Sequence, residues 1–328
     1  MSEKLDHCVF KVDSIPYCVW DLNLHEKNME FISSIDPKYF EYLAKIHYKN
    51  IESEEKLLAS VALRTAYYHG LETLFTLLCA TIQAPDCMFG WVLKSHPFEV
   101  RNMVEKIKKG SNDIFNKFKL DHISWHEISA LIYADCSKDI NMIKKITINF
   151  SRLWSNFSDD FLNKIHINEY NSIKHGFRTR LGGFSIAVGL QDTRKVPAAQ
   201  VKMRAFGQSD YGTSFFSVKE IDGAPCTKTY PNFRVIRDSI NWNPENMFHG
   251  LLLISASLNN VLSYLMILNG KDPNTCKLCS LENDEDYQKP WGNPVGVKSS
   301  SMNVVISSNH IRRFSNEEIL EELKNISQ

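Results

Sequence analysis

The hydrophobic period of this 328-residue chain changes near residue 180, and that change limits which folds are available to it. Upstream, apolar residues recur at the spacing of amphipathic helices. Downstream, in GGFSIAVGL (182–190), apolar side chains alternate with small or polar ones, as a half-buried strand requires. We therefore predict one compact α+β unit that is mainly helical, with a small antiparallel β-sheet inserted after the helices.

The stretch NEYNSIKHGFR, residues 168–178, joins the two regions. Wound as an α-helix at about 100° per residue, it separates a basic polar face from an aromatic face. The polar face holds Asn168, Asn171, His175 and Arg178, and the opposite face holds Tyr170, Ile173 and Phe177. Such a helix can bury its aromatic side and present its basic side.

Start and stop signals place the other helices of the upstream region. The signals are capping side chains, a proline at a first helical position with a glycine after the last, and a capping box. They predict one helix that begins after Asp36 and a second of about thirty residues from Ser53 to Gln83. Three further helices are predicted from Pro97 to Gly110, from Ser124 onward, and from Asp139 to Asn163. Residues 1–35 are an N-terminal arm, and residues 36–180 form a helical bundle.

Strands and one long apolar helix are predicted downstream. Three or four antiparallel strands fall in residues 181–242, within GGFSIAVGL, AQVKMRAF, SFFSVKEI and TKTYPNFRVI. Asn243 caps a helix over residues 243–270 that packs back on the bundle. Residues 271–328 are a loop-rich tail that ends in a short charged helix, SNEEILEELKN.

The charge of the chain is balanced overall but locally uneven. Its formal net charge is zero, so no global field drives binding to nucleic acid or membranes. Residues 171–206 nonetheless form a predicted cationic patch with one acidic residue, Asp192. The patch contains Lys174, Arg178, Arg180, Arg194, Lys195, Lys202 and Arg204.

Compartment and metal signals are weak. Eight cysteines lack a repeating pattern and the N-terminus lacks a signal-peptide layout, so we expect reduced thiols in the cytoplasm. The apolar run Leu251–Leu268 contains asparagines and serines, which favours a buried helix over a membrane span. Cys276 and Cys279 form one C-x-x-C pair, which is half of the ligand pattern of a zinc site, and His310 is a further possible donor. We expect no metal, because no second C-x-x-C or close histidine pair follows.

A polar stripe runs along the helix that ends at Gln83. The stripe contains Arg64, Thr65, Tyr68, His69, Glu72 and Thr76. Buried ionisable groups are costly unless they are paired, so the stripe must face water or polar partners on another element. NEYNSIKHGFR, with His175 and Arg178, is the partner that we expect.

Arg64 and His69, with four residues between them in one long helix, resemble the R-x(4–6)-H motif of the HEPN superfamily. The segment KHGFR, with Asn171 four residues before its histidine, is similar to segments of uncharacterised bacterial HEPN-like proteins. The family is all-helical and occurs in toxins, phage-defence proteins and RNA-processing enzymes. The resemblance covers at most residues 36–180 and 243–269. It implies metal-independent cleavage of RNA by a homodimer that needs no cofactor.

The resemblance also implies residue roles. Arg64 and His69 would be catalytic, because histidine transfers protons near neutral pH and arginine stabilises charge on a phosphate. His175 is a third catalytic candidate, and the ribose 2′-OH would be the nucleophile. The candidates for substrate binding are Asn171, Lys174, Arg178 and Arg180.

Each candidate also has a structural interpretation. Arg64 with Glu72 would form an intrahelical ion pair, and His69 with Glu72 a hydrogen-bonded pair. Gly176 and Arg178 would form a helix terminus. A second class of function therefore stays open, a non-catalytic module that binds RNA, a nucleotide or an acidic protein through the cationic patch. No P-loop, dinucleotide-binding glycine motif or nucleophile elbow is present, which disfavours nucleotide hydrolysis, hydride transfer and ester hydrolysis.

Overall fold

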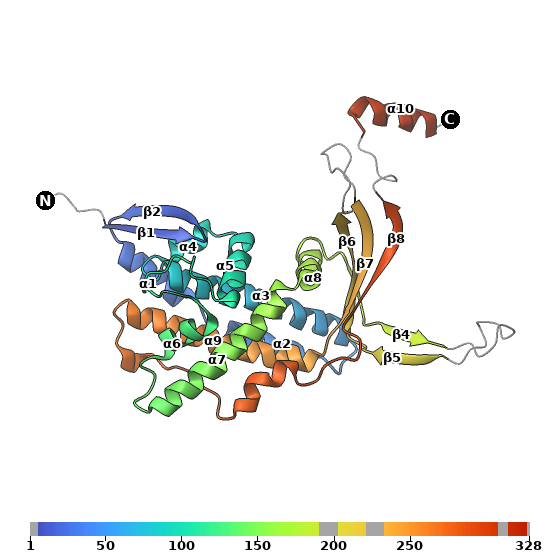
Figure 1. Cartoon of the computed structure of the whole chain (residues 1–328). Coiled ribbons are helices and arrows are strands. Elements are labelled where there is room, and N and C mark those ends of the chain that lie inside the picture. The colour runs from blue at the N-terminus through green and yellow to red at the C-terminus, as the bar shows by residue number, and fades with distance from the viewer. Residues whose placement is uncertain (1–5, 190–202, 221–232, 308–313, 327–328) are drawn as a thin grey trace. The chain divides into compact units, whose positions relative to one another are not determined.

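The computed structural model describes residues 6–189, 203–220, 233–307 and 314–326, and the chain divides into two compact units (Figure 1). The first unit comprises Met1–Tyr170 and Asn243–Pro294, and the second comprises Asn171–Trp242 and Val295–Gln328. Helices dominate and the sheets are small and antiparallel, which confirms the mainly helical α+β class. Two units, each made of discontinuous chain, replace the one compact unit that the sequence predicted.

Two long apolar helices, α3 (Lys56–Gln83) and α9 (Pro244–Leu268), form the centre of the first unit. They pack closely because small residues lie between them. A Cβ atom added at Gly250 would lie 2.5 Å from Cε2 of Tyr67, and one added at Gly70 would lie 3.1 Å from Ile254. By length and composition α9 could cross a membrane, but most of its apolar stretch is buried within this unit.

The other helices of the first unit contact α3 or α9. They are α1 (Leu24–Ser34), α2 (Tyr39–Tyr48), α4 (Met88–Lys94), α5 (Pro97–Lys109), α6 (Trp125–Tyr133) and α7 (Ile140–Leu162). The 3₁₀ helices η2 (Pro273–Thr275) and η3 (Asp284–Trp291) follow α9. Short α4 had not been predicted.

Local signals set the ends of several helices as predicted. The side chains of Ser124, Asp139 and Asn243 accept hydrogen bonds from backbone N–H groups in the first turns of α6, α7 and α9. Pro97 starts α5, and Gly110 ends it in the left-handed conformation, with φ of 67°. The proline-in, glycine-out prediction is therefore confirmed.

The N-terminal arm is a hairpin followed by α1. Strands β1 (Asp6–Val12) and β2 (Ile15–Asp21) pair antiparallel, and Phe10 and Val12 are buried. The amide of Gln83, at the end of α3, accepts from the Asp13 N–H (2.9 Å) and donates to its carbonyl (3.0 Å). This exchange ties the hairpin turn to the central helix.

The second unit contains a four-stranded antiparallel sheet in the order β3-β6-β7-β8. Its strands are β3 (Thr179–Leu181), β6 (Gly212–Glu220), β7 (Phe233–Asn241) and β8 (Ser299–Ser307). A separate ribbon pairs β4 (Ser185–Val188) with β5 (Arg204–Gln208), and α10 (Asn316–Ile326) follows the sheet.

Two sequence predictions for this region are corrected. All four residues of β4 are exposed, because β4 belongs to a two-stranded ribbon with β5 rather than to the larger sheet, so GGFSIAVGL does not contain the predicted half-buried strand. Strand β8 lies in the segment predicted as a loop-rich tail. The parts of AQVKMRAF before residue 203 and of TKTYPNFRVI before residue 233 lie outside the described residues. The terminal charged helix is confirmed as α10.

Candidate functional site

Arg64 is buried and forms an ion pair with Glu169 of α8 (Lys164–Lys174). Its Nη2 lies 2.9 Å and its Nε 3.0 Å from Glu169 Oε2, and its guanidinium lies 4.7 Å from the centre of the Tyr68 ring. Burial opposes the charge of Arg64, but the ion pair outweighs it and raises the arginine pKa. The guanidinium is therefore held inside the first unit.

The element that partners the polar stripe was predicted correctly, but the partner residues were not. Glu169 and Tyr170 of α8 make the contacts, rather than His175 and Arg178. The Tyr170 hydroxyl donates to Glu72 Oε2 at 3.3 Å. Glu169 had been overlooked, although it is the one acidic residue in NEYNSIKHGFR and so the available partner for a buried arginine.

Asp160 of α7 forms a second polar group that sequence reasoning missed. Its Oδ2 accepts from the Tyr67 hydroxyl at 2.7 Å and from Trp291 Nε1 at 3.3 Å. His166 Nδ1 lies 3.9 Å from Oδ1. Burial raises the pKa of Asp160, although the hydrogen bond from Tyr67 and the charge of Arg64 act in the opposite direction. These contacts connect α3, α7 and η3.

His69 lies on the surface, whereas Arg64 of the same helix is buried. The His69 ring packs edge-on against Phe40, with ring centres 5.3 Å apart, and against Tyr39, at 6.5 Å. The separation follows from the helix itself, because five residues turn the side-chain direction by about 140°. The structure therefore does not bring these two motif residues together within one chain.

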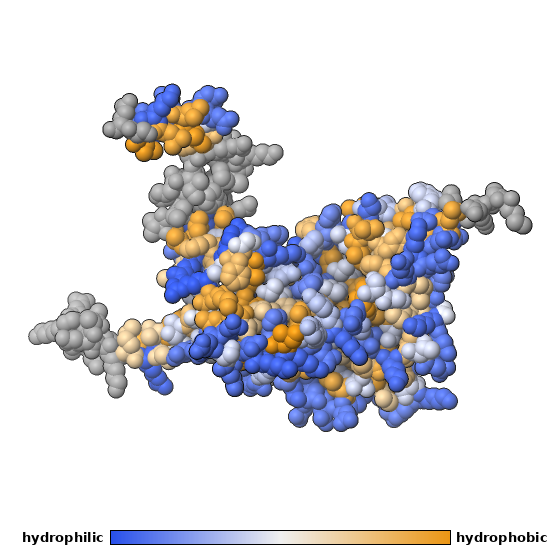
Figure 2. Space-filling view, turned by 180° about the vertical axis from the view of Figure 1, so that it is seen from behind, coloured by the Kyte–Doolittle hydropathy of each residue, from blue (hydrophilic) through white to orange (hydrophobic). Residues whose placement is uncertain are grey.

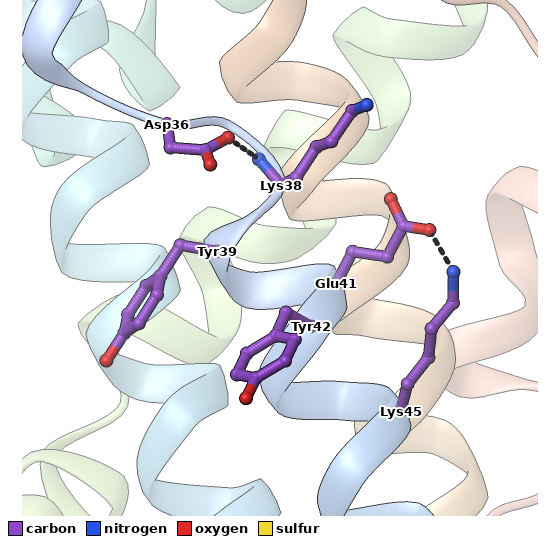
Figure 3. A pocket seen from close by; sticks show the side chains of 6 residues that line it. All are labelled: Asp36, Lys38, Tyr39, Glu41, Tyr42 and Lys45. Carbon is purple, nitrogen blue, oxygen red and sulfur yellow. Dashed lines mark hydrogen bonds and ion pairs between the residues drawn. The ribbon is translucent and has the colours of Figure 1, made fainter.

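A surface hollow of about 410 Å³ lies along α2 beside Tyr39 (Figure 3). It is lined by Asp36, Lys38, Tyr39, Glu41, Tyr42 and Lys45. Glu41 pairs with Lys45, and Asp36 accepts from the backbone N–H of Lys38 at 2.9 Å. Since acids and lysines balance, the hollow offers aromatic surface without a net field.

NEYNSIKHGFR does not remain helical to its end. Helix α8 stops at Lys174, and the N–H groups of Arg178 and Phe177 bond the carbonyls of Ser172 (2.8 Å) and Ile173 (3.0 Å). These bonds close a turn at the C-terminal end of α8, in which Gly176 and Phe177 have φ of 109° and 51°. The predicted face shared by Asn168, Asn171, His175 and Arg178 is therefore wrong beyond Lys174.

The substrate-binding candidates all lie exposed in the second unit. They are Asn171, Lys174, Arg178 and Arg180, together with the catalytic candidate His175. Arg204 of the predicted cationic patch is also exposed, whereas Arg194, Lys195 and Lys202 lie outside the described residues. Thus the described cations of the patch belong to one unit, and Arg64 and His69 belong to the other.

One face of the four-stranded sheet combines exposed apolar groups with two arginines. Paired residues on neighbouring antiparallel strands share a face, and Phe216 pairs with Arg237, which pairs with Met302. Arg180 pairs with Ser214, two residues from Phe216, and so lies on the same face. We call Arg180, Ser214, Phe216, Val218, Arg237 and Met302 the platform. Phe216, Val218 and Met302 are 63%, 66% and 65% exposed, and Figure 2 shows hydrophobic surface over these strands.

The opposite face of this sheet is buried. Phe215 and Ile240 are each 2% exposed, and the buried Asp238 accepts from Ser217 (2.6 Å) and Ser301 (2.5 Å). Alternation along SFFSVKEI therefore buries Phe215 on one face of the sheet and leaves Phe216 exposed on the other. Phe216, Val218 and Met302 together leave a group of apolar side chains exposed on the other face, which marks the platform as a functional candidate.

No metal-binding group is found within the described residues. No cluster of three or more histidine, cysteine, aspartate or glutamate side chains could hold an ion there. Cys276 and Cys279 are free thiols, and His310 lies outside the described residues. 

Comparison with known proteins gave no match. No family model matches the chain, and no curated protein or solved structure is significantly similar to it. Function must therefore be argued from the chemistry of the residues.

Proposed function

We propose that the protein is a non-catalytic RNA-binding protein that holds single-stranded RNA on the platform of its second unit. The observation that carries this proposal is the pairing of exposed Phe216 with Arg237 on one sheet face, with Arg180 on the same face. Unstacked bases stack on exposed aromatic rings and arginine planes, and arginines also bind phosphates. The proposed ligand is therefore single-stranded RNA, because its unpaired bases are free to stack.

The charges of the second unit suit this role. Arg180 is exposed and Arg237 is half-buried, and neither forms an ion pair within the described residues. Both guanidinium groups are thus able to meet phosphates. Lys174 and Arg178, exposed at the end of α8, add positive charge to the same unit.

The proposal predicts measurable contributions. Base–aromatic stacking is worth about 1–3 kcal/mol per base, so Phe216→Ala should weaken binding roughly 5- to 150-fold. Each phosphate contact contributes about 0.7 to the slope of log affinity against log salt for single strands. Arg237→Gln and Arg180→Gln should each reduce the slope by about that amount.

Fluorescence anisotropy with labelled single-stranded RNA tests these numbers over a series of salt concentrations. Phe98→Ala is a matched control, because Phe98 is 65% exposed but lies on α5 of the first unit. Arg152→Gln is the control for charge, since Arg152 is exposed on α7. Equal losses for Phe216→Ala and Phe98→Ala, or no binding by wild type, would reject the proposal.

The metal-independent ribonuclease implied by the HEPN resemblance is the second candidate. One observation favours it, namely that exposed His69 lies against Tyr39 beside a hollow that could seat RNA. It also requires a guanidinium at the phosphate, and Arg64 is held by Glu169. For that reason we rank it second.

Incubation of a labelled RNA pool with protein in EDTA tests this alternative. Cleavage that is lost in His69→Ala but kept in His25→Ala, which changes an exposed histidine elsewhere, would establish the ribonuclease. His175→Ala tests the third catalytic candidate. Sedimentation tests the homodimer that the resemblance implies, and intact RNA with every protein would eliminate the ribonuclease.

A further inference from the structure

A row of three serines crosses the platform face beside Phe216 and Arg237. Ser214 of β6 pairs with Ser239 of β7, which pairs with Ser300 of β8. Successive side chains of a strand point to opposite faces, so Ser214 lies on the same face as Phe216, two residues away along β6. We call Ser214, Ser239 and Ser300 the serine row. It lies two residues along the strands from the pair Phe216 and Arg237, which is roughly 6–7 Å.

The hydroxyl groups of the serine row have the chemistry to bond a polar ligand. All three side chains are half-buried, and Ser214 Oγ lies 2.7 Å from Ser239 Oγ. Each hydroxyl has one O–H donor and two acceptor lone pairs, so a bonded pair of hydroxyls still holds one O–H and several lone pairs. The serine row therefore offers both donors and acceptors on the face that carries the platform.

The surroundings of Phe216 differ between the two directions along its strand. In one direction lie Val218 and its partner Val235. In the other direction lies the serine row, which Arg180 of β3 continues because Arg180 pairs with Ser214. A polar group placed against valines loses hydrogen bonds to water and gains none, which costs free energy. A nucleotide whose base stacks on Phe216 therefore directs its sugar and phosphate toward the serine row and Arg180.

The sugar of such a nucleotide is the group that the serine row meets first. A ribose is bonded directly to its base, so the sugar of a base stacked on Phe216 lies beside the ring. The ribose 2′-hydroxyl is both a donor and an acceptor, as the serine hydroxyls are, and it is the group by which a protein distinguishes RNA from DNA. Deoxyribose has no oxygen at this position and leaves the serine hydroxyls without that partner, which lowers affinity.

We propose that the serine row binds the ribose 2′-hydroxyl and makes the platform selective for RNA over single-stranded DNA. The inference rests on the proposed function, because it assigns the sugar contacts of the same site. Phe216 and Arg237 contact the bases, which RNA and DNA share, whereas the serine row contacts the sugar, which differs between them. Each 2′-hydroxyl that the row bonds should favour RNA by roughly 2- to 13-fold.

Fluorescence anisotropy with the full-length protein and the triple variant Ser214→Ala/Ser239→Ala/Ser300→Ala tests the inference. The probes are single-stranded RNA, DNA of the same sequence with deoxyuridine in place of thymidine, and 2′-fluoro RNA, which keeps a ribose-like sugar conformation without a hydroxyl. We expect wild type to prefer RNA to both other probes, and the triple variant to bind all three with the affinity of wild type for DNA. Ser299→Ala is the matched control, because Ser299 is exposed on β8 but pairs with Ile240, on the opposite face.

The remaining outcomes separate this inference from the proposed function. Equal binding of RNA and DNA by wild type would reject sugar selection while leaving the platform as a site for single strands in general. An RNA preference that the triple variant keeps, or an equal loss for all probes, would reject the serine row as its source. Phe216→Ala should weaken RNA and DNA binding by the same factor, since stacking involves the base alone. Absence of binding to every probe by wild type would reject the proposed function together with the inference.

Discussion

Replacing Arg64 should destabilise the protein strongly, because its partner would remain buried and charged. The Arg64 and Glu169 side chains are 4% and 0% exposed. Removing one member of a buried ion pair typically costs about 3–5 kcal/mol. For a unit of this size, 1 kcal/mol shifts the melting temperature by about 2–4 °C, so Arg64→Leu should lower it by roughly 6–20 °C.

A double-mutant cycle in urea measures this effect. Arg64→Leu, Glu169→Leu and the double variant are followed by helical circular dichroism, at low and high salt. We expect the double variant to cost less than the sum of the single variants, because no isolated charge remains. Salt should change the coupling little, since a buried pair is poorly screened.

Lys45→Gln is the matched control, because Lys45 pairs with Glu41 at the surface. Its cost should stay below about 1 kcal/mol. A cost of less than 1 kcal/mol for Arg64→Leu as well, with additive single variants, would refute the reasoning. It would mean that the Arg64 guanidinium is accessible to a phosphate, which would favour the ribonuclease hypothesis.

Three further predictions follow from burial and backbone geometry. The folded pKa of Asp160 is raised above 3.8, so its contribution to stability is present at acid pH and is lost as pH rises through the folded pKa. The free energy of unfolding of Asp160→Asn, measured from pH 3 to 7, should therefore increase relative to that of wild type as the pH rises. Phe177→Gly should stabilise the protein by about 0.5–1 kcal/mol, because φ is positive at this residue and its side chain is 51% exposed. Gly176→Ala should destabilise it by about 1–3 kcal/mol, because alanine disfavours the positive φ of Gly176, and denaturant midpoints compare the two variants. Gly250→Ala should cost about 1–3 kcal/mol by thermal unfolding, since the new Cβ would overlap Tyr67, and an unchanged midpoint would show that α3 and α9 are less tightly packed.

Local signals in the sequence predicted most of the helical elements. Caps at Ser124, Asp139 and Asn243 act within one turn, so the residues that decide them are neighbours in the sequence. Strand β8 depends instead on pairing with β7, and its sequence SSSMNVVIS is rich in serine, so the strand became evident only with its partner. Pairing between distant segments leaves little local trace.

The candidate site shows the same division between local and distant information. Helical periodicity correctly required a polar partner for the stripe that contains Arg64. It could not select Glu169, because the helical wheel for NEYNSIKHGFR continued past the turn at Gly176 that ends α8. The platform was missed because the strands were read singly, and only their register places Phe216 beside Arg237.

The insertion of one unit into the other has a consequence for synthesis on the ribosome. Helix α3 is apolar on most of its surface, and the helix that covers it, α9, ends about 185 residues later. At about 5–20 residues per second, the nascent chain would wait roughly 10–40 s before that cover emerges. During this interval α3 has the properties of a chaperone client, and synonymous codons that slow translation between residues 84 and 243 should increase aggregation without altering the finished protein.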